Sequence, residues 1–205
     1  MSDLLLIGGG GHCRSCIDVI EANGKYRIRG IVLPLSDDTD GVLGYPALGS
    51  DEDLPLLLQE TPQALVTVGQ IRSPEIRIRL FELLKQSGGK LPRIVSPFAY
   101  CSKYAELNEG TIVMHGAIVN AGASIGTNCI INSQALIEHD VVVADHCHVS
   151  TGAKLNGGVH IGKGSFIGSG AILKEGIILG ENVIVSAGQV IRRNVPSGAV
   201  IKHDT

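Results

Sequence analysis

Three of the seven histidines of this 205-residue chain lie within ten residues of one another, in the segments Glu138-His139-Asp140 and His146-Cys147-His148. An imidazole has an unperturbed pKa near 6.5, so at neutral pH it can take a proton from an attacking amine or hydroxyl. Two other roles are open for such a cluster: solvated side chains on an outer face, or a metal site, because imidazole is a common zinc ligand. Which of these three roles the histidines have depends on the elements that position their side chains.

The second half of the chain repeats every six residues, and the repeat predicts its architecture. Every sixth residue from Leu107 to Ile191 is aliphatic, without an insertion. Gly or Asn occupies most positions three residues after these aliphatics, and small or β-branched residues follow at the fourth. Gly and Asn tolerate the positive φ of a corner, so each hexad is predicted to form a short strand and a corner. Three hexads make one coil, which predicts a parallel β-helix of about five coils beginning near residue 95.

The corner positions depart from Gly and Asn at three consecutive places, Gln134, Asp140 and His146. A repeat that fails in one patch suggests a functional site. His139 comes two residues after an inward aliphatic residue, so its ring should leave the prism. Gly157 follows one coil later, and parallel strands stack roughly 4.8 Å apart. We therefore predict that His139 lies beside the bare backbone of Gly157, whose N–H group could stabilise an oxyanion during acyl transfer.

Residues 1–94 are predicted to form a separate α/β domain of Rossmann-like type. The expected strands are Leu4–Ile7, Ile28–Leu33, Ala64–Val68 and Arg93–Val95, and the expected helices are Cys13–Asn23, Glu52–Gln59 and Glu75–Gln86. The turn Gly8–His12 joins the first strand to the first helix, where backbone N–H groups could hold a phosphate. Cys13 replaces the third glycine of a dinucleotide fingerprint, so a nucleotide-sugar phosphate is favoured over NAD. A plain tight turn is the alternative.

Composition excludes several other classes of function. A net charge of −3, with 18% charged residues, gives no basic surface for nucleic acid or an anionic membrane. No apolar run approaches the ~18 residues of a membrane span, and no signal-peptide pattern is expected at the N-terminus. The odd number of five cysteines favours a reduced, cytoplasmic protein, although Cys13 and Cys16 have the spacing of a redox pair.

The segments Gly8–His12, Ile137–Asp140 and His148–Ala153 make the chain resemble a known family over nearly its whole length. It resembles the bacterial nucleotide-sugar acetyltransferases, which include UDP-4-amino-sugar N-acetyltransferases and sialic-acid O-acetyltransferases. The resemblance implies a left-handed hexapeptide β-helix over residues 95–205 and acetyl-CoA as the donor. It also implies a homotrimer, with active sites between neighbouring β-helices.

The same resemblance implies a role for each matching residue. His139 matches the general base, and Asp140 matches the adjacent carboxylate that orients it. Positions near the thioester and along the CoA arm are matched by His148, Gly157 and Ala187. Positions near the acceptor and its phosphates are matched by Asn132, Gly8, Gly9, Gly10, Gly11 and His12.

Two segments depart from the family pattern. Leu33-Pro34-Leu35 replaces an Asp-Asp pair that contacts the nucleotide, and Asp37-Asp38 come slightly later. The Val-Ala-Gly-x-Pro segment that usually closes the family near the adenine of CoA is replaced by 200–205.

The leading hypothesis is direct acetyl transfer from acetyl-CoA to an amino group of a nucleotide-linked sugar, in bacterial surface-glycan biosynthesis and without a bound metal. No Ser or Cys is paired with a base in a recognisable arrangement, so no acyl-enzyme is expected. Three alternatives are kept: O-acetylation of a sugar hydroxyl, as on sialic acid; a zinc hydratase; and a non-catalytic β-helical scaffold.

Overall fold

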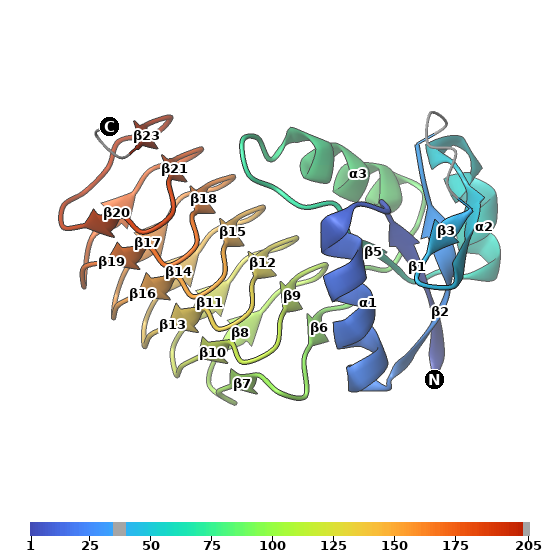
Figure 1. Cartoon of the computed structure of the whole chain (residues 1–205), viewed down its shortest axis with the longest axis horizontal. Coiled ribbons are helices and arrows are strands. Elements are labelled where there is room, and N and C mark those ends of the chain that lie inside the picture. Colours follow the sequence, from blue (N-terminus) through green and yellow to red (C-terminus); the bar gives the residue numbers. More distant parts are fainter. Residues whose placement is uncertain (35–39, 203–205) are drawn as a thin grey trace.

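The computed structural model describes residues 1–34 and 40–202, which form an α/β unit beside a three-sided β-helix (Figure 1). The Asp37-Asp38 pair lies outside the described residues. None of the helices in the described residues is long and apolar enough to cross a membrane.

The α/β unit contains one five-stranded sheet in the order β3-β4-β2-β1-β5. Its strands are β1 (Ser2–Ile7), β2 (Tyr26–Val32), β3 (Gly41–Val42), β4 (Tyr45–Gly49) and β5 (Ala64–Val66). Its helices are α1 (Gly11–Asn23), α2 (Leu54–Glu60) and α3 (Glu75–Gln86), with a 3₁₀ turn η1 (Asp51–Asp53) before α2. All pairs are parallel except β3 with β4, so the predicted strand–helix alternation is confirmed.

Eighteen two-residue strands make up the β-helix, in three parallel sheets that form the sides of a prism. The β12 sheet contains β6 (Ile94–Val95), β9 (Ile112–Val113), β12 (Ile130–Ile131), β15 (His148–Val149), β18 (Phe166–Ile167), β21 (Ile184–Val185) and β23 (Val200–Ile201). The β13 sheet contains β7 (Tyr100–Cys101), β10 (Ile118–Val119), β13 (Leu136–Ile137), β16 (Lys154–Leu155), β19 (Ile172–Leu173) and β22 (Val190–Ile191). The β14 sheet contains β8 (Glu106–Leu107), β11 (Ser124–Ile125), β14 (Val142–Val143), β17 (His160–Ile161) and β20 (Ile178–Leu179).

The predicted 18-residue step holds along most of the β-helix. Ile131 pairs with Val149, for example, and backbone hydrogen bonds such as Ile130 N–H to the Cys147 carbonyl join successive coils. The last coil is two residues shorter, because β21 pairs Ile184 with Val200. One predicted strand was misplaced. Ile94 and Val95 pair with β9 and open the β12 sheet instead of completing the α/β sheet.

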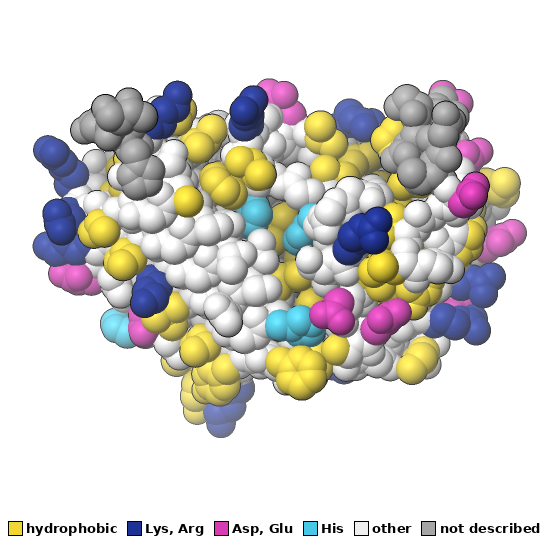
Figure 2. All heavy atoms as spheres, in the orientation of Figure 1, with side chains coloured by type: hydrophobic (Ala, Val, Ile, Leu, Met, Phe, Trp, Pro, Cys, Tyr) yellow, Lys and Arg dark blue, Asp and Glu magenta, His cyan; other side chains and the backbone are white. Residues whose placement is uncertain are grey.

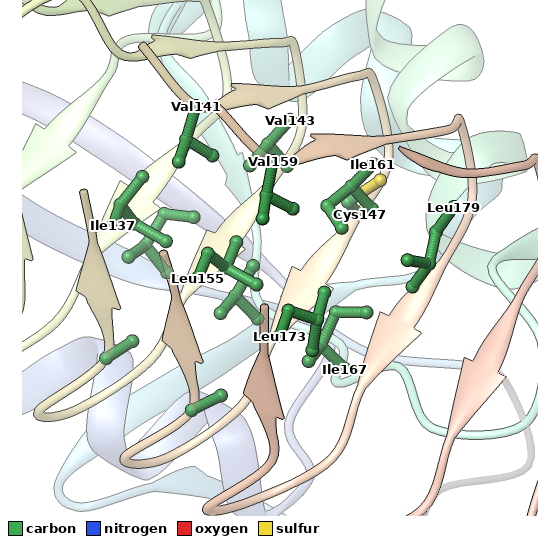
Figure 3. Packing of buried hydrophobic residues seen from close by; sticks show 14 of the residues in the cluster. Ile137, Val141, Val143, Cys147, Leu155, Val159, Ile161, Ile167, Leu173 and Leu179 are labelled. Atoms are coloured by element: carbon green, nitrogen blue, oxygen red, sulfur yellow. The ribbon is translucent and has the colours of Figure 1, made fainter. Parts of the chain in front are cut away.

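The inward aliphatic column fills the prism, as Figure 3 shows for Ile137, Leu155 and Leu173 on consecutive coils. Burying a Leu or Ile side chain contributes roughly 1.5–3 kcal/mol, and the column supplies such a residue on every strand of a coil.

The corners keep their conformation where Gly and Asn are missing: φ is 60° at Gln134, 60° at Asp140 and 58° at His146. Left-handed φ at a non-glycine residue costs roughly 1–2 kcal/mol.

The α/β unit packs on the outer face of the β12 sheet. Ile17 and Ile20 of α1 belong to the same buried cluster as Ile112, Met114 and Ile130 of the β-helix. Cys13 and Cys16 also lie in this cluster, and burial raises the pKa of both thiols. A buried thiol with a raised pKa forms little thiolate, so this pair is a packing element.

Replacing Ile161 by Ala should destabilise the fold much more than the same change at Ile178. Both are on neighbouring strands of the β14 sheet, but Ile161 is 2% exposed and points inward, whereas Ile178 is 52% exposed. A buried Ile→Ala change costs about 2–5 kcal/mol, through lost burial and the cavity that remains. Urea unfolding of the two variants measures the difference, and equal midpoints would contradict the inward column.

Candidate active site

A cleft of about 690 Å³ opens between the α/β unit and the β12 sheet. We call it the interdomain cleft. Its α/β wall consists of Gly10, Gly11, His12, Ser15, Val68, Gly69, Gln70 and Ile71. Its β-helix wall consists of Asn132, Ser133, His148, Ser150, Thr151, Phe166 and Ser169. Figure 2 shows histidine side chains where these two parts of the molecule meet.

The glycine turn divides into a packed part and an open part. A Cβ at Gly8 would strike Val68, and one at Gly9 would strike Leu33, so these glycines let the turn pack closely. Gly10 and Gly11 line the interdomain cleft, and a Cβ on either would meet nothing within 4 Å. Gly10 is the N-cap of α1 and supplies no side-chain cap. The Cys13 N–H donates to the Gly10 carbonyl, so the N–H groups of Gly11 and His12 are the ones left for a ligand at this end of the cleft.

A hydrogen-bond chain fixes the orientation of His148 and Asn132. The ring Nδ1 of His148 lies 2.6 Å from the Gln70 carbonyl, which can only accept, so Nδ1 carries the proton. The neutral ring then accepts through Nε2 from Asn132 Nδ2, 3.1 Å away. The other end of that amide is held as well, because Asn132 Oδ1 accepts from the Ser133 N–H at 2.8 Å. The second Nδ2 hydrogen of Asn132 is therefore presented in a defined direction.

Both cleft histidines are neutral at neutral pH. Burial, and secondly the Arg77 guanidinium, lowers the pKa of His12 to about 3. Burial also lowers the pKa of His148 to about 4, against the opposing hydrogen bond to the Gln70 carbonyl. The Nε2 atom of His12 is buried without a hydrogen-bond partner. These rings can donate or accept hydrogen bonds, but they are not poised to take up a proton.

His139 lies in the opposite environment, at the exposed corner between β13 and β14. Its side chain is 66% exposed, and Nδ1 donates to Asp140 Oδ2 at 2.9 Å. That hydrogen bond is the main cause that raises the pKa of His139. It also leaves the Nε2 lone pair free to accept a proton.

The predicted neighbour of His139 is confirmed. A Cβ built on Gly157 would lie 2.6 Å from both Cε1 and Nε2 of His139, so the ring covers the bare backbone of the next coil. A backbone hydrogen bond joins the two coils at this place: the Gly158 N–H donates to the His139 carbonyl at 3.0 Å. Within the described residues, the N–H of Gly157 itself has no backbone partner. A base and a free donor therefore lie side by side.

The sequence-predicted residues form two groups in one chain. His12, Asn132 and His148 meet in the interdomain cleft, near the corner between β12 and β13. His139, Asp140 and Gly157 occupy the corner between β13 and β14. The exposed Ala187 belongs to the first corner, one coil beyond Ser169.

Several cleft residues were not identified from the sequence. Ser133, Thr151 and Ser169 recur at the 18-residue step, so the repeat contained a signal for them. Gln70 and Ile71 come from a loop of the α/β unit, and no periodicity points to them. In the part of the chain that the structure describes, no three His, Cys, Asp or Glu side chains are grouped so as to hold a metal ion.

Comparison with known proteins finds a family model for the α/β unit and another for the β-helix. Residues 3–84 match the family model for the PglD N-terminal domain, and residues 158–193 match that for the hexapeptide repeat of succinyl-transferase. The fold and the repeat together define a hexapeptide acyltransferase. No curated protein matches the chain.

Solved structures narrow this class to one family. A variant of perosamine N-acetyltransferase from Caulobacter crescentus, in complex with CoA and GDP-perosamine, is 33% identical, with a TM-score of 0.92 over 98% of this chain and 93% of that one. The acetyltransferase domain of PglB from Neisseria gonorrhoeae is 34% identical, with a TM-score of 0.89 over 98% and 96%. The chain thus belongs to the bacterial nucleotide-sugar acetyltransferases with a left-handed β-helix. It is an acyltransferase, and acetyl-CoA is its co-substrate.

Replacing Asp140 by Asn should lower the pKa of His139, because the Asp140 carboxylate stabilises the protonated ring through the hydrogen bond from Nδ1. NMR titration of the histidine rings measures this change, and Asp145→Asn on the next corner serves as the control. In the wild type, His139 should titrate above its ordinary value, whereas His148 should stay neutral down to about pH 4. An unchanged His139 titration in the Asp140 variant would contradict the pairing.

Proposed function

We propose that this chain transfers the acetyl group of acetyl-CoA to an amino group on a nucleotide-linked sugar, as a step in bacterial surface-glycan synthesis. The observation that carries the proposal is the position of His139, with its Nε2 free and beside the backbone of Gly157. The related enzyme crystallised with CoA and GDP-perosamine supports the donor and the acceptor class. The free thiols of all five cysteines agree with a cytoplasmic enzyme.

In the proposed reaction, the sugar amine attacks the thioester carbonyl carbon directly. Nε2 of His139 takes the proton that the nitrogen loses, the new C–N bond forms, and the C–S bond breaks as the intermediate collapses. The imidazolium returns that proton to the leaving thiolate, so the products are the acetamido sugar and CoA thiol. Asp140 stabilises the imidazolium, and the Gly157 N–H donates to the oxyanion that forms on the carbonyl oxygen.

The interdomain cleft is the proposed binding site for the nucleotide sugar. Its volume lies within the ~300–1,000 Å³ typical of small-molecule sites. The open N-terminus of α1, at Gly10 and Gly11, favours the phosphates, because helix N-termini bind anions. Asn132 and His148 present oriented polar atoms on the other wall, close to where the sugar would lie. Gly8 and Gly9 support this turn from behind.

A homotrimer would unite the two corners that one chain keeps apart. The β13 sheet lies between them, and its outward residues are Tyr100, Ile118, Leu136, Lys154, Ile172 and Val190. This row is apolar except for Lys154, and Ile118, Val190 and Tyr100 are exposed in the single chain. If three β13 sheets face a common axis, the His139 corner of one subunit meets the cleft corner of the next. The second subunit would then supply Ala187 and His148 beside CoA.

Replacing His139 by Ala should reduce kcat at least ~100-fold, because a general base contributes about 10²–10⁴ in rate. CoA binding, measured by calorimetry, should persist. His160→Ala, which removes an exposed histidine from the β14 sheet, is the matched control. The assay follows CoA thiol release with acetyl-CoA and 4-amino sugars linked to UDP, GDP or dTDP, and with sialic acid and CMP-sialic acid. Near-wild-type turnover of the His139 variant would remove it from the role, and exclusive use of a hydroxyl acceptor would refute N-acetylation.

Ile118→Glu should dissociate the assembly and abolish activity, because it places three carboxylates against an apolar interface. Val142→Glu, on the outward face of the β14 sheet, should leave both unchanged. Light scattering coupled to size exclusion gives the mass, and circular dichroism confirms that each variant is folded. A wild-type protein with the mass of one chain would contradict the shared site.

A further inference from the structure

Arg77 of α3 is the one charged side chain that is buried in the described chain, at 1% exposure. Its Nη1 donates to the carbonyls of Val66 and Val68, at 3.0 and 2.6 Å. Its Nη2 donates to the carbonyl and the side-chain oxygen of Asn128, at 3.1 and 2.7 Å. All four acceptors are neutral, and no carboxylate among the described residues forms an ion pair with it. Burying an unpaired charge is costly, so its retention calls for a function.

The buried guanidinium contacts the backbone of the interdomain cleft wall. Val68, whose carbonyl accepts the shortest of its hydrogen bonds, is itself part of the cleft wall. Three buried side-chain atoms of the described residues lack a hydrogen-bond partner: His12 Nε2, Gln70 Oε1 and Arg77 Nε. His12 and Gln70 line the cleft, and Arg77 donates to the carbonyl of Val68 in its wall. Buried polar groups are nearly always satisfied, so this clustering marks a place that is complete only with a ligand.

The cleft wall contains no Lys, Arg, Asp or Glu side chain. A diphosphate entering it would therefore meet the α1 N-terminus but no cation that it could touch. The charge of Arg77 nevertheless extends into this space. It contributes to lowering the pKa of His12 and His148 in the cleft, and of the adjacent His146. The thiols of Cys16 and Cys129 are the other titratable groups that face it, and both are neutral when protonated.

We propose that Arg77 is a positioning residue whose buried charge balances the diphosphate of the nucleotide sugar without touching it. The inference rests on the proposed function, because it assumes that the nucleotide occupies the interdomain cleft. It predicts that the charge discriminates between a nucleotide and its nucleoside, which share the base and the ribose but differ in the phosphates.

The test compares Arg77→Gln with the wild type in the full-length protein. Calorimetry gives the Kd of GDP, UDP, dTDP and CMP, and of the nucleoside of each. The preference for nucleotide over nucleoside should fall at least tenfold in Arg77→Gln, which corresponds to about 1.4 kcal/mol. Arg79→Gln is the matched control, because it removes an exposed charge from the same helix, paired with Asp51 on the surface. A ratio of two affinities does not change when part of a preparation is unfolded.

Two further measurements separate the charge from its hydrogen bonds. Arg77→Lys keeps the charge with fewer hydrogen bonds, so it should keep the nucleotide preference even where its Tm falls. In Arg77→Gln, the pKa of His148 measured by NMR should rise, and in Arg77→Lys, which keeps the charge, it should stay low. A structural defect that exposes the ring would raise the pKa in both variants. If neither variant folds, the wild type still provides a test: its preference should fall less than threefold between 50 and 500 mM NaCl, because buried charges are screened little. A steep fall would assign the preference to exposed arginines such as Arg14 and Arg72.

The outcomes distinguish this inference from the proposed function. Tight nucleotide binding by the wild type, with an unchanged preference in Arg77→Gln, overturns the role of Arg77 and leaves the acetyltransferase site in place. Binding of no nucleotide by the wild type overturns both.

Discussion

The backbone ladder between coils is the constraint from which the rest of the molecule follows. Because strands along most of the β-helix bond to the strand 18 residues later, the position of a side chain there is set by its number in the repeat. The inward aliphatics hold this register, since a slip of one residue would turn the whole column outward. The ladder therefore places His139 against Gly157 and lines up the hydroxyls along the cleft corner without any contact made for that purpose.

The histidines show how one residue type is assigned different chemistry by its surroundings. His12 and His148 lie between two packed units, where burial favours the neutral ring. His139 lies in solvent beside a carboxylate, which favours the charged ring. The same imidazole thus serves as a fixed hydrogen-bonding group in one place and as an exchangeable base in the other, and the two environments lie on adjacent corners of one prism.

The features that could be predicted from the sequence are those set by a residue's position in the repeat. The hexad repeat predicted the strands, the corners and the proximity of His139 to Gly157, because residues 18 apart lie on neighbouring coils whatever packs around them. The contacts between the α/β unit and the β-helix do not follow from the repeat. The Gln70 contacts to His148 and the Arg77 contacts to Asn128 depend on how α3 and its preceding loop dock on the β12 sheet. Ile94 and Val95 were misplaced for a related reason: a short apolar strand at a junction fits either sheet until pairing decides.

The shortened last coil has a consequence for how the molecule behaves among its own copies. A stack of parallel strands ends in an open ladder of N–H and carbonyl groups, which invites a second stack to dock end to end and build a fibre. After β22, the two exposed residues Arg192 and Arg193 and then Pro196 interrupt the regular repeat, and β23 closes over β21 two residues early. Like charges and a missing donor make that terminal rung a poor template. The irregular last coil therefore opposes end-to-end pairing of these strands with a second copy.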